Sequence, residues 1–174
     1  MMSRAVLDTA FRQIIVATFA AVAELGFVRR GLILRKIVQG NAAVIQFQRS
    51  VASSRDKILF TVNLAVVCGE LLEPYQPALE KAGAFDSHLW DRIGMFLPGR
   101  PDKWWEITEA TDVNELAAEV SSLVSSQGAP YILRYLDTNE LIALWQAGQC
   151  PRLTDRQRVM YLERLTKSRK GAEA

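Results

Sequence analysis

Polar amides, one arginine and a pair of adjacent tryptophans are the residues with the clearest capacity for binding chemistry. The candidate site residues are Gln46, Gln48, Ser50, Asn63, Arg92, Trp104 and Trp105. Amides donate and accept hydrogen bonds, a guanidinium holds a carboxylate or phosphate, and an indole stacks on a planar group. These residue types predict a site that orients a planar polar ligand or a peptide, with no catalytic residue among them.

Alternation along two predicted strands is expected to gather the amides. In "VIQFQRS", Gln46 and Gln48 alternate with apolar residues, and in "FTVNLAV", Thr61 and Asn63 do the same. Side chains on a strand point alternately to its two faces, so pairing the apolar faces leaves these four residues on one polar surface. The alternative is an ordinary solvated sheet face without a function.

The segment "SHLWDRIGMF" fits either a helix or a strand, and we expect a strand. A strand would allow Arg92 and His88 to join the polar surface. The segment "KWWEI" is expected to return as the partner strand. Because neighbours on a strand point opposite ways, one of Trp104 and Trp105 is expected in the core and the other over the polar surface.

Flanking patterns predict the elements that position this surface. A helical apolar face spans Arg4 to Leu25 and ends at Gly26. Three β-runs follow with short connections, which favour antiparallel pairing: "FVRRGLILRKIVQGN", "AAVIQFQRS" and "KILFTVNLAVV". Capping-box spacings predict helices over 113–125, 138–147 and 155–167, and Gly128-Ala-Pro130 is expected to end the first of them. The expected fold is α+β: a single domain over 1–174, with an antiparallel sheet of about five strands, a long N-terminal helix and a helical C-terminal segment.

Composition argues for a soluble cytoplasmic protein. The formal charge of +2 over 174 residues gives no reason to expect nucleic acid or a membrane surface. Cys68 and Cys150 lie far apart and have no second cysteine or histidine at metal spacing, so we expect thiols in a reducing compartment. "IIVATFAAVAELG" resembles a signal sequence in composition, but its helical register and the preceding Asp8 and Arg12 indicate a core helix.

Recognisable catalytic patterns are scarce. The sole histidine, His88, has no nucleophile motif near it, and the chain has no phosphate-binding glycine loop. A metal site or cofactor is therefore not expected. Several loop carboxylates are candidate bases without a predicted partner: Glu70, Glu73, Asp86, Asp91 and Asp102.

Five short motifs in sequence order carry a family resemblance: "LGFVRRG", "VIQFQRS", "FTVNLAV", "RIG" and "DKWWEI". The series resembles the DUF4304 family of bacterial domains of unknown function, over roughly Leu7 to Ile107. The resemblance marks six of the candidate residues as motif positions: Gln48, Ser50, Asn63, Arg92, Trp104 and Trp105. One departure is Ala65, where the family pattern has glycine, so a backbone approach that relies on glycine is in doubt there. The resemblance implies no activity.

The sequence therefore favours a non-catalytic binding or protein-interaction module that recognises an unknown protein or a small polar ligand. Two alternatives remain open. One is an enzyme for a small polar substrate, with His88 or a loop carboxylate as base. The other is a binder of single-stranded nucleic acid, with a tryptophan as stacking platform among basic residues, although the near balance of charges argues against nucleic acid as a partner. The oligomeric state is left open.

Overall fold

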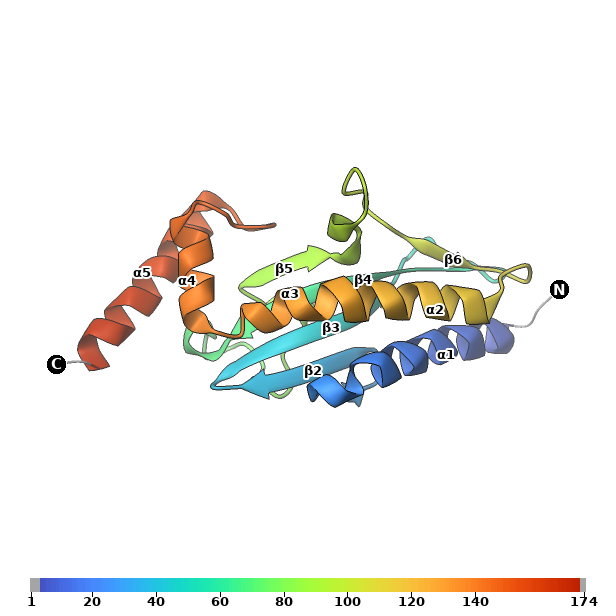
Figure 1. Cartoon of the computed structure of the whole chain (residues 1–174), viewed down its shortest axis with the longest axis horizontal. Helices are drawn as coiled ribbons and strands as arrows, with labels where there is room; N and C mark the ends of the chain where they lie inside the picture. Colours follow the sequence, from blue (N-terminus) through green and yellow to red (C-terminus); the bar gives the residue numbers. More distant parts are fainter. Residues whose placement is uncertain (1–3, 173–174) are drawn as a thin grey trace.

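The computed structural model describes residues 4–172, which form one antiparallel β-sheet with helices on one face (Figure 1). Helix α1 (Arg4–Val22) precedes the sheet, and α2 (Val113–Leu123), α3 (Ala129–Arg134), α4 (Thr138–Gln146) and α5 (Asp155–Ala172) follow it. Helices α1 and α2 lie side by side along the sheet, whereas α4 and α5 stand at one end. The predicted α+β class is confirmed.

The sheet is built around β4, its longest strand. The strands are β1 (Val28–Arg30), β2 (Ile33–Val38), β3 (Asn41–Arg49), β4 (Ile58–Cys68), β5 (Leu89–Arg92) and β6 (Trp105–Ile107). Strands β1 to β5 are antiparallel neighbours in chain order. Strands β5 and β6 both pair with β4, at different positions along its length, so the expectation that "KWWEI" returns as the partner of the strand in "SHLWDRIGMF" is wrong. The edge of β4 that does not face β3 is therefore shared by two short strands.

The predicted single strand over "FVRRGLILRKIVQGN" is wrong, because this segment forms the hairpin β1–β2. Gly31 has a φ of 60°, in the left-handed region that glycine adopts without strain, and it reverses the chain. Val28 then pairs with Arg35, and Arg30 with Ile33. The alternation of side chains continues on both sides of the turn, so the period-two pattern alone does not reveal the reversal.

The predicted break at Gly128-Ala-Pro130 is also wrong. A π-helical turn (Val124–Gly128) connects α2 to α3, and Pro130 lies in the first turn of α3. Proline has no N–H to donate, and the wider π turn accommodates this loss within a continuous helix. Gly128 is needed for packing, because a Cβ there would lie only 3.0–3.1 Å from Ile93 and Leu64 side-chain atoms.

The main core lies between the sheet and α1, α2 and α3. Helix α1 contributes an apolar face to it: Leu7, Ala10, Phe11, Ile14, Ile15, Thr18 and Val22 are buried. The segment Arg4–Leu25 also has the length and composition that would let a helix cross a membrane, and 39% of its apolar window is buried inside the fold. Length and composition are shared by core helices and spanning helices, so they do not distinguish the two.

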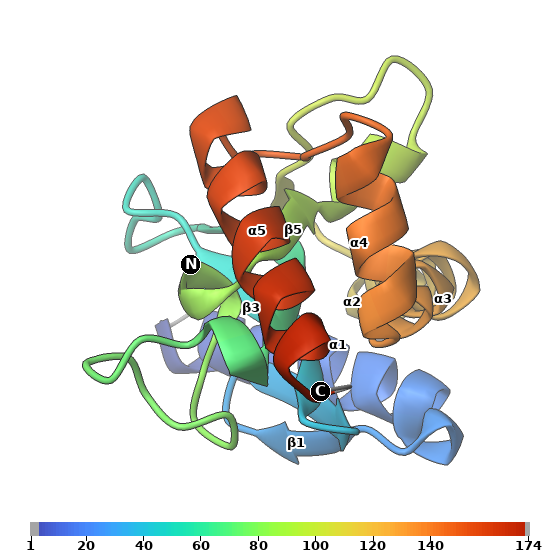
Figure 2. The same cartoon turned by 90° about the vertical axis from the view of Figure 1, so that its left-hand side faces the viewer.

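The opposite face of the sheet, which we call the outer face, is covered in part by the long connection between β4 and β5. Ala42, Val44, Ala65 and Val67 on the sheet pack there with Ala82 and Ala84 of the connection. In Figure 2 this connection, coloured green, lies across the sheet from α1 and α2. The small side chains on β3 and β4 let this connection approach the sheet closely. The polar residues of these two strands lie farther along the same face.

Candidate functional site

Polar residues of three strands meet on the outer face. Gln46 of β3 pairs with Asn63 of β4, and Asn63 pairs with Arg92 of β5. Gln48 pairs with Thr61, one step further along the same face. Directly opposite residues on antiparallel strands have adjacent side chains, so the sheet brings these groups together. We call the set Gln46, Gln48, Asn63, Arg92 and Trp104 the polar row.

Hydrogen bonds engage all three amides of the row. Asn63 Nδ2 donates to Gln48 Oε1 at 2.9 Å. Gln46 Oε1 accepts the backbone N–H of Ala84 at 2.8 Å, which ties this end of the row to the connection between β4 and β5. Gln46 therefore makes a structural contact at one end of the row. The centre of the row is Asn63, which bonds to Gln48 and pairs with Arg92.

Two buried polar atoms at this centre have no hydrogen-bond partner among the described residues: Asn63 Oδ1 and Arg92 Nε. Asn63 is fully buried, and the side chain of Arg92 is 19% exposed. One atom is an acceptor and the other a donor, and their residues are register neighbours. An unsatisfied buried polar atom costs about 1–3 kcal/mol, so a ligand that bonds to these two atoms would recover part of that cost. Arg49 Nε and Trp145 Nε1 are also buried without a partner among the described residues, but the pair at Asn63 and Arg92 combines an acceptor and a donor on register neighbours.

Trp104 lies over Arg92, as the alternation in "KWWEI" predicts for one of the two tryptophans. The guanidinium carbon is 4.9 Å from the Trp104 ring centroid, which is a cation–π distance. Asp102 accepts hydrogen bonds from Arg92 and, at 3.2 Å, from the Trp104 indole N–H. The hydrogen bond from Arg92 lowers the pKa of Asp102. The carboxylate thus holds both recognition groups in place while its own side chain is 53% exposed.

Trp105 and Ser50 lie apart from the polar row. Trp105 is 4% exposed and stacks on Phe60 in the main core, with 5.5 Å between ring centroids. Its indole N–H donates to Glu119 of α2 at 2.8 Å. Ser50 Oγ accepts the N–H of Ala52 in the turn after β3. These two candidate residues therefore make structural contacts, and the tryptophan pair divides between the core and the outer face.

His88 does not join the polar surface, contrary to the expectation for a strand beginning at this residue. It precedes β5 and is 2% exposed, packed edge-on against Tyr161 of α5 with 5.0 Å between ring centroids. Its Nδ1 accepts the N–H of Cys68 at 3.1 Å. Burial lowers the pKa of His88 from 6.5 to about 4. The imidazole is neutral near pH 7, and its contacts belong to the packing of α5 on the sheet.

The chain matches the sequence profile of one protein family. The profile that matches the chain is described as "Domain of unknown function (DUF4304)", and it covers residues 19–135. The chain belongs to the DUF4304 family. The matched range contains the whole polar row and extends through α2 and α3 of this DUF4304 domain. No curated protein and no solved structure matches the chain.

A second arginine–indole pair lies beside the polar row. Trp90 is two residues before Arg92 on β5 and points to the same face. The guanidinium carbon of Arg152 is 5.1 Å from the Trp90 ring centroid. Arg152 belongs to the turn between α4 and α5 and also bonds Asp91 at 2.8 Å. No local pattern relates Arg152 to Trp90, which lie far apart in the sequence, so sequence reasoning missed this pair.

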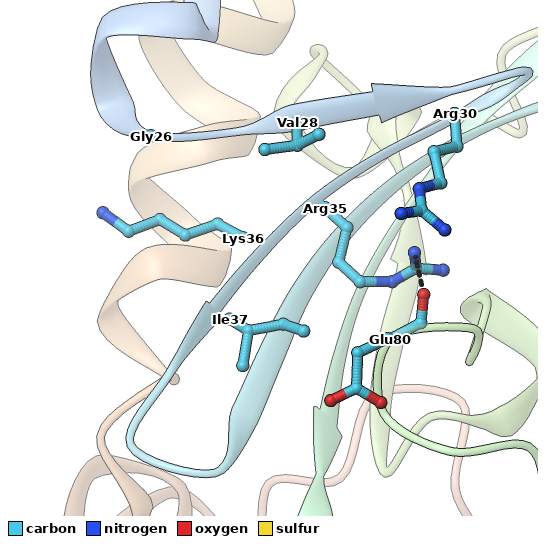
Figure 3. Close-up of a pocket in the computed structure, with 7 residues that line it drawn as sticks. All are labelled: Gly26, Val28, Arg30, Arg35, Lys36, Ile37 and Glu80. Atoms are coloured by element: carbon cyan, nitrogen blue, oxygen red, sulfur yellow. Dashed lines mark hydrogen bonds between the residues drawn. The ribbon is translucent and has the colours of Figure 1, made fainter.

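A hollow of about 320 Å³ lies on the outer face beside β1 and β2 (Figure 3). Arg30 and Arg35 extend towards each other there, near Glu80. The Arg35 guanidinium donates to the backbone oxygens of Glu80, at 2.7 Å, and of Ala82. Its donors are therefore engaged in holding the β4–β5 connection against the sheet, and we assign this hollow a structural role.

The described residues contain no group of three or more histidine, cysteine or acidic side chains that could hold a metal ion. Of the loop carboxylates, Asp91 and Asp102 lie closest to the polar row, and both are paired with arginines. Glu73 pairs with Arg164 of α5, far from the row in sequence and in the fold. The arrangement is suited to hydrogen bonding, ion pairing and stacking.

Proposed function

We propose that this protein is a non-catalytic binding module in the cytoplasm, and that its polar row captures a polar segment of a partner protein. The observation that carries the proposal is the pair of complementary buried atoms at the centre of the row, Asn63 Oδ1 and Arg92 Nε, which have no partner among the described residues. A peptide group offers both an N–H donor and a C=O acceptor. One residue of an extended partner segment, whose own N–H and C=O project to the same side, would therefore satisfy both atoms.

Binding in this way requires the segment before β6 to move aside. Lys103 O accepts from Thr61 Oγ1 at 2.8 Å, and Trp104 covers Arg92. Asp102, which is largely exposed, is the group that an incoming polar or acidic side chain would replace on Arg92. Trp104 would then stack on the ligand, because an exposed indole next to a guanidinium can cover any flat polar group.

The apolar face of α1 is packed inside the fold, which supports a cytoplasmic location over a membrane one. Fractionation of the native host into cytoplasmic, extracytoplasmic and membrane fractions would test the location directly. Recovery of the protein in the cytoplasmic fraction, without detergent, is the expected result, and recovery only in membranes or from an extracytoplasmic fraction would contradict it.

Affinity purification from the native host tests the binding role. The tagged full chain would be compared with Asn63→Ala, Arg92→Ala and Trp104→Ala, and with Arg55→Ala as a control at an exposed arginine in the turn between β3 and β4. We expect at least one protein that wild type and Arg55→Ala retain and that all three row variants lose. Its direct binding to the purified chain would then be measured. A set of co-purifying proteins that is the same for all variants would contradict the proposal.

A further inference from the structure

A cavity on the helix side of β5 forms a second candidate site, separate from the polar row. It measures about 510 Å³ and lies between β5, the loop that follows it, α3, and the turn between α4 and α5. In Figure 1 the loop after β5 and the turn between α4 and α5 both lie above α3. Small-molecule sites in proteins are commonly of this size.

Hydrogen-bond donors converge on this cavity. Arg100, Tyr131, Tyr135 and Gln149 all line it. Burial raises the pKa of Tyr131, with smaller contributions from Tyr135 and Asp91 in the same direction, while Arg100 acts in the opposite direction. Tyr131 is thus a neutral phenol near pH 7 and can donate its hydroxyl proton. Tyr135, Asp91 and Arg100 line the same cavity as Tyr131.

The charges around the cavity leave one cation in excess. Asp91 is paired with Arg152, which bonds its Oδ1 at 2.8 Å. The backbone N–H of Arg92 also donates to Oδ1, so both of these hydrogen bonds end on one oxygen of the carboxylate. Among the residues that the structure describes, no carboxylate forms a salt bridge with Arg100. A guanidinium beside two phenols is a receptor for a carboxylate, and the Oδ2 side of Asp91 can accept from a donor next to it.

We propose that this cavity binds a small α-amino or α-hydroxy carboxylate. Arg100 and the tyrosine hydroxyls would hold the ligand carboxylate, and Asp91 would accept from its amino or hydroxyl group. Met95 and Leu144 line the apolar part of the cavity and would contact the ligand side chain. The tyrosine rings are fixed by edge-on packing, with 5.2 Å between the centroids of Tyr131 and Tyr135, so the two hydroxyls are positioned before the ligand arrives.

The test uses the purified full chain and four sets of probes at equal ionic strength. The probes are the common α-amino acids, the α-hydroxy acids glycolate and lactate, the simple carboxylates acetate and propionate, and inorganic phosphate. Thermal unfolding would identify stabilising probes, and calorimetric titration would then give Kd. We expect at least one α-amino or α-hydroxy acid to bind saturably, and to bind about tenfold or more tightly than the simple carboxylate of matching size.

Variants then assign the binding to this cavity. Tyr131→Phe keeps the ring and removes the hydroxyl, and Arg100→Ala removes an exposed side chain, so both are expected to fold. We expect Kd to rise about tenfold in Tyr131→Phe, and binding to be lost in Arg100→Ala. Arg55→Ala and Trp104→Ala should bind as the wild type does, which separates this inference from the role of the polar row.

Three results would overturn the inference. The first is the absence of saturable binding by any α-amino or α-hydroxy acid at millimolar concentration. The second is binding of acetate or phosphate as tight as that of the best α-substituted acid, which would indicate a general anion site. The third is unchanged affinity in both Tyr131→Phe and Arg100→Ala, which would place the ligand elsewhere.

Discussion

Asn63 and Arg92 are paired across β4 and β5, and each has one buried polar atom without a hydrogen-bond partner among the described residues. The two atoms have opposite hydrogen-bonding character, yet the geometry of the sheet does not join them. Folding alone gains nothing from this arrangement. A binding site that must present a donor and an acceptor to a ligand does gain from it. If the two atoms were hydrogen-bonded within the protein, neither would be free to bind the ligand.

The first prediction is that Asn63→Leu abolishes partner binding and changes the free energy of unfolding little. The variant takes away the donor of Gln48 Oε1, but Gln48 is only partly buried and its amide can turn to water, and the variant also removes a buried unsatisfied oxygen. We expect its free energy of unfolding in urea to lie within about 1 kcal/mol of wild type.

Thr61→Val is the matched control for this prediction, because Thr61 is buried on the same face and its hydroxyl is satisfied by Lys103 O. It removes a formed hydrogen bond and leaves a carbonyl unpaired, so it should lose about 1–2 kcal/mol. If Asn63→Leu loses as much stability as Thr61→Val, the amide is a structural group and the argument from its unpaired oxygen is wrong.

A second prediction concerns Arg35, which we regard as the anchor of the β4–β5 connection. Arg35→Met removes all its hydrogen bonds to the backbone oxygens of Glu80 and Ala82, and these oxygens then lose a charged donor. We expect a loss of about 2–4 kcal/mol in urea unfolding. Limited proteolysis should also become faster between β4 and β5.

Arg30→Met is the control for Arg35, because Arg30 lies beside it in the same hollow (Figure 3) and is exposed. Burial and, to a smaller extent, the charge of Arg30 lower the pKa of Arg35. Removing Arg30 should leave stability unchanged or slightly higher. Equal losses in the two variants would show that the hydrogen bonds of Arg35 do not hold the connection.

A third prediction is a pH dependence of stability that arises from His88. Its pKa is about 4 in the folded chain and 6.5 as the ordinary value, because burial disfavours the charged form. Between these values the unfolded chain binds the proton and the folded chain does not. The contribution is therefore fully present above pH 6.5 and is lost as the pH falls towards 4.

The size of this effect should be about 2 kcal/mol between about pH 7 and pH 5, measured by urea unfolding at each pH. His88→Gln provides the comparison, since His88 is the sole histidine and the variant has no other imidazole to titrate. The variant should be less stable near pH 7 because it loses the packing on Tyr161, but its stability should vary much less over the same interval. Parallel pH profiles for the two proteins would contradict the assigned cause.

The polar row was predictable because alternation along β3 and β4 is a local property of the sequence. The amides occupy alternate positions, and the register of the sheet then aligned Gln46, Asn63 and Arg92. The same alternation separated Trp104 from Trp105. What failed was the assignment of chain reversals and helix continuity, because Gly31 and Pro130 permit more than one backbone path.

The partners of the row residues were not predictable. Asp102 bonds Arg92, and beside the row Arg152 covers Trp90, through contacts that depend on how loops return to the sheet. The same is true of His88, which the strand pattern placed on the polar surface and which packing places against Tyr161. Loop paths of this kind are set by tertiary packing, and a period of two or 3.6 residues carries no information on them.

The last prediction tests whether the close fit of the segment before β6 positions Trp104. A Cβ on Gly94 would lie 2.0 Å from Pro101 O and 3.0 Å from Lys103 N, so Gly94→Ala must displace this segment. We expect a loss of about 2 kcal/mol or more, together with a shift of the Trp104 indole N–H signal in NMR spectra. Gly148→Ala is the control: Gly148 has a positive φ, 76°, and no atom lies within 4 Å of its added Cβ. It should cost about 1 kcal/mol through backbone strain and leave the Trp104 signal in place. If the Trp104 signal is unchanged in Gly94→Ala, the tryptophan is held over Arg92 by their mutual contact and not by the path of the loop.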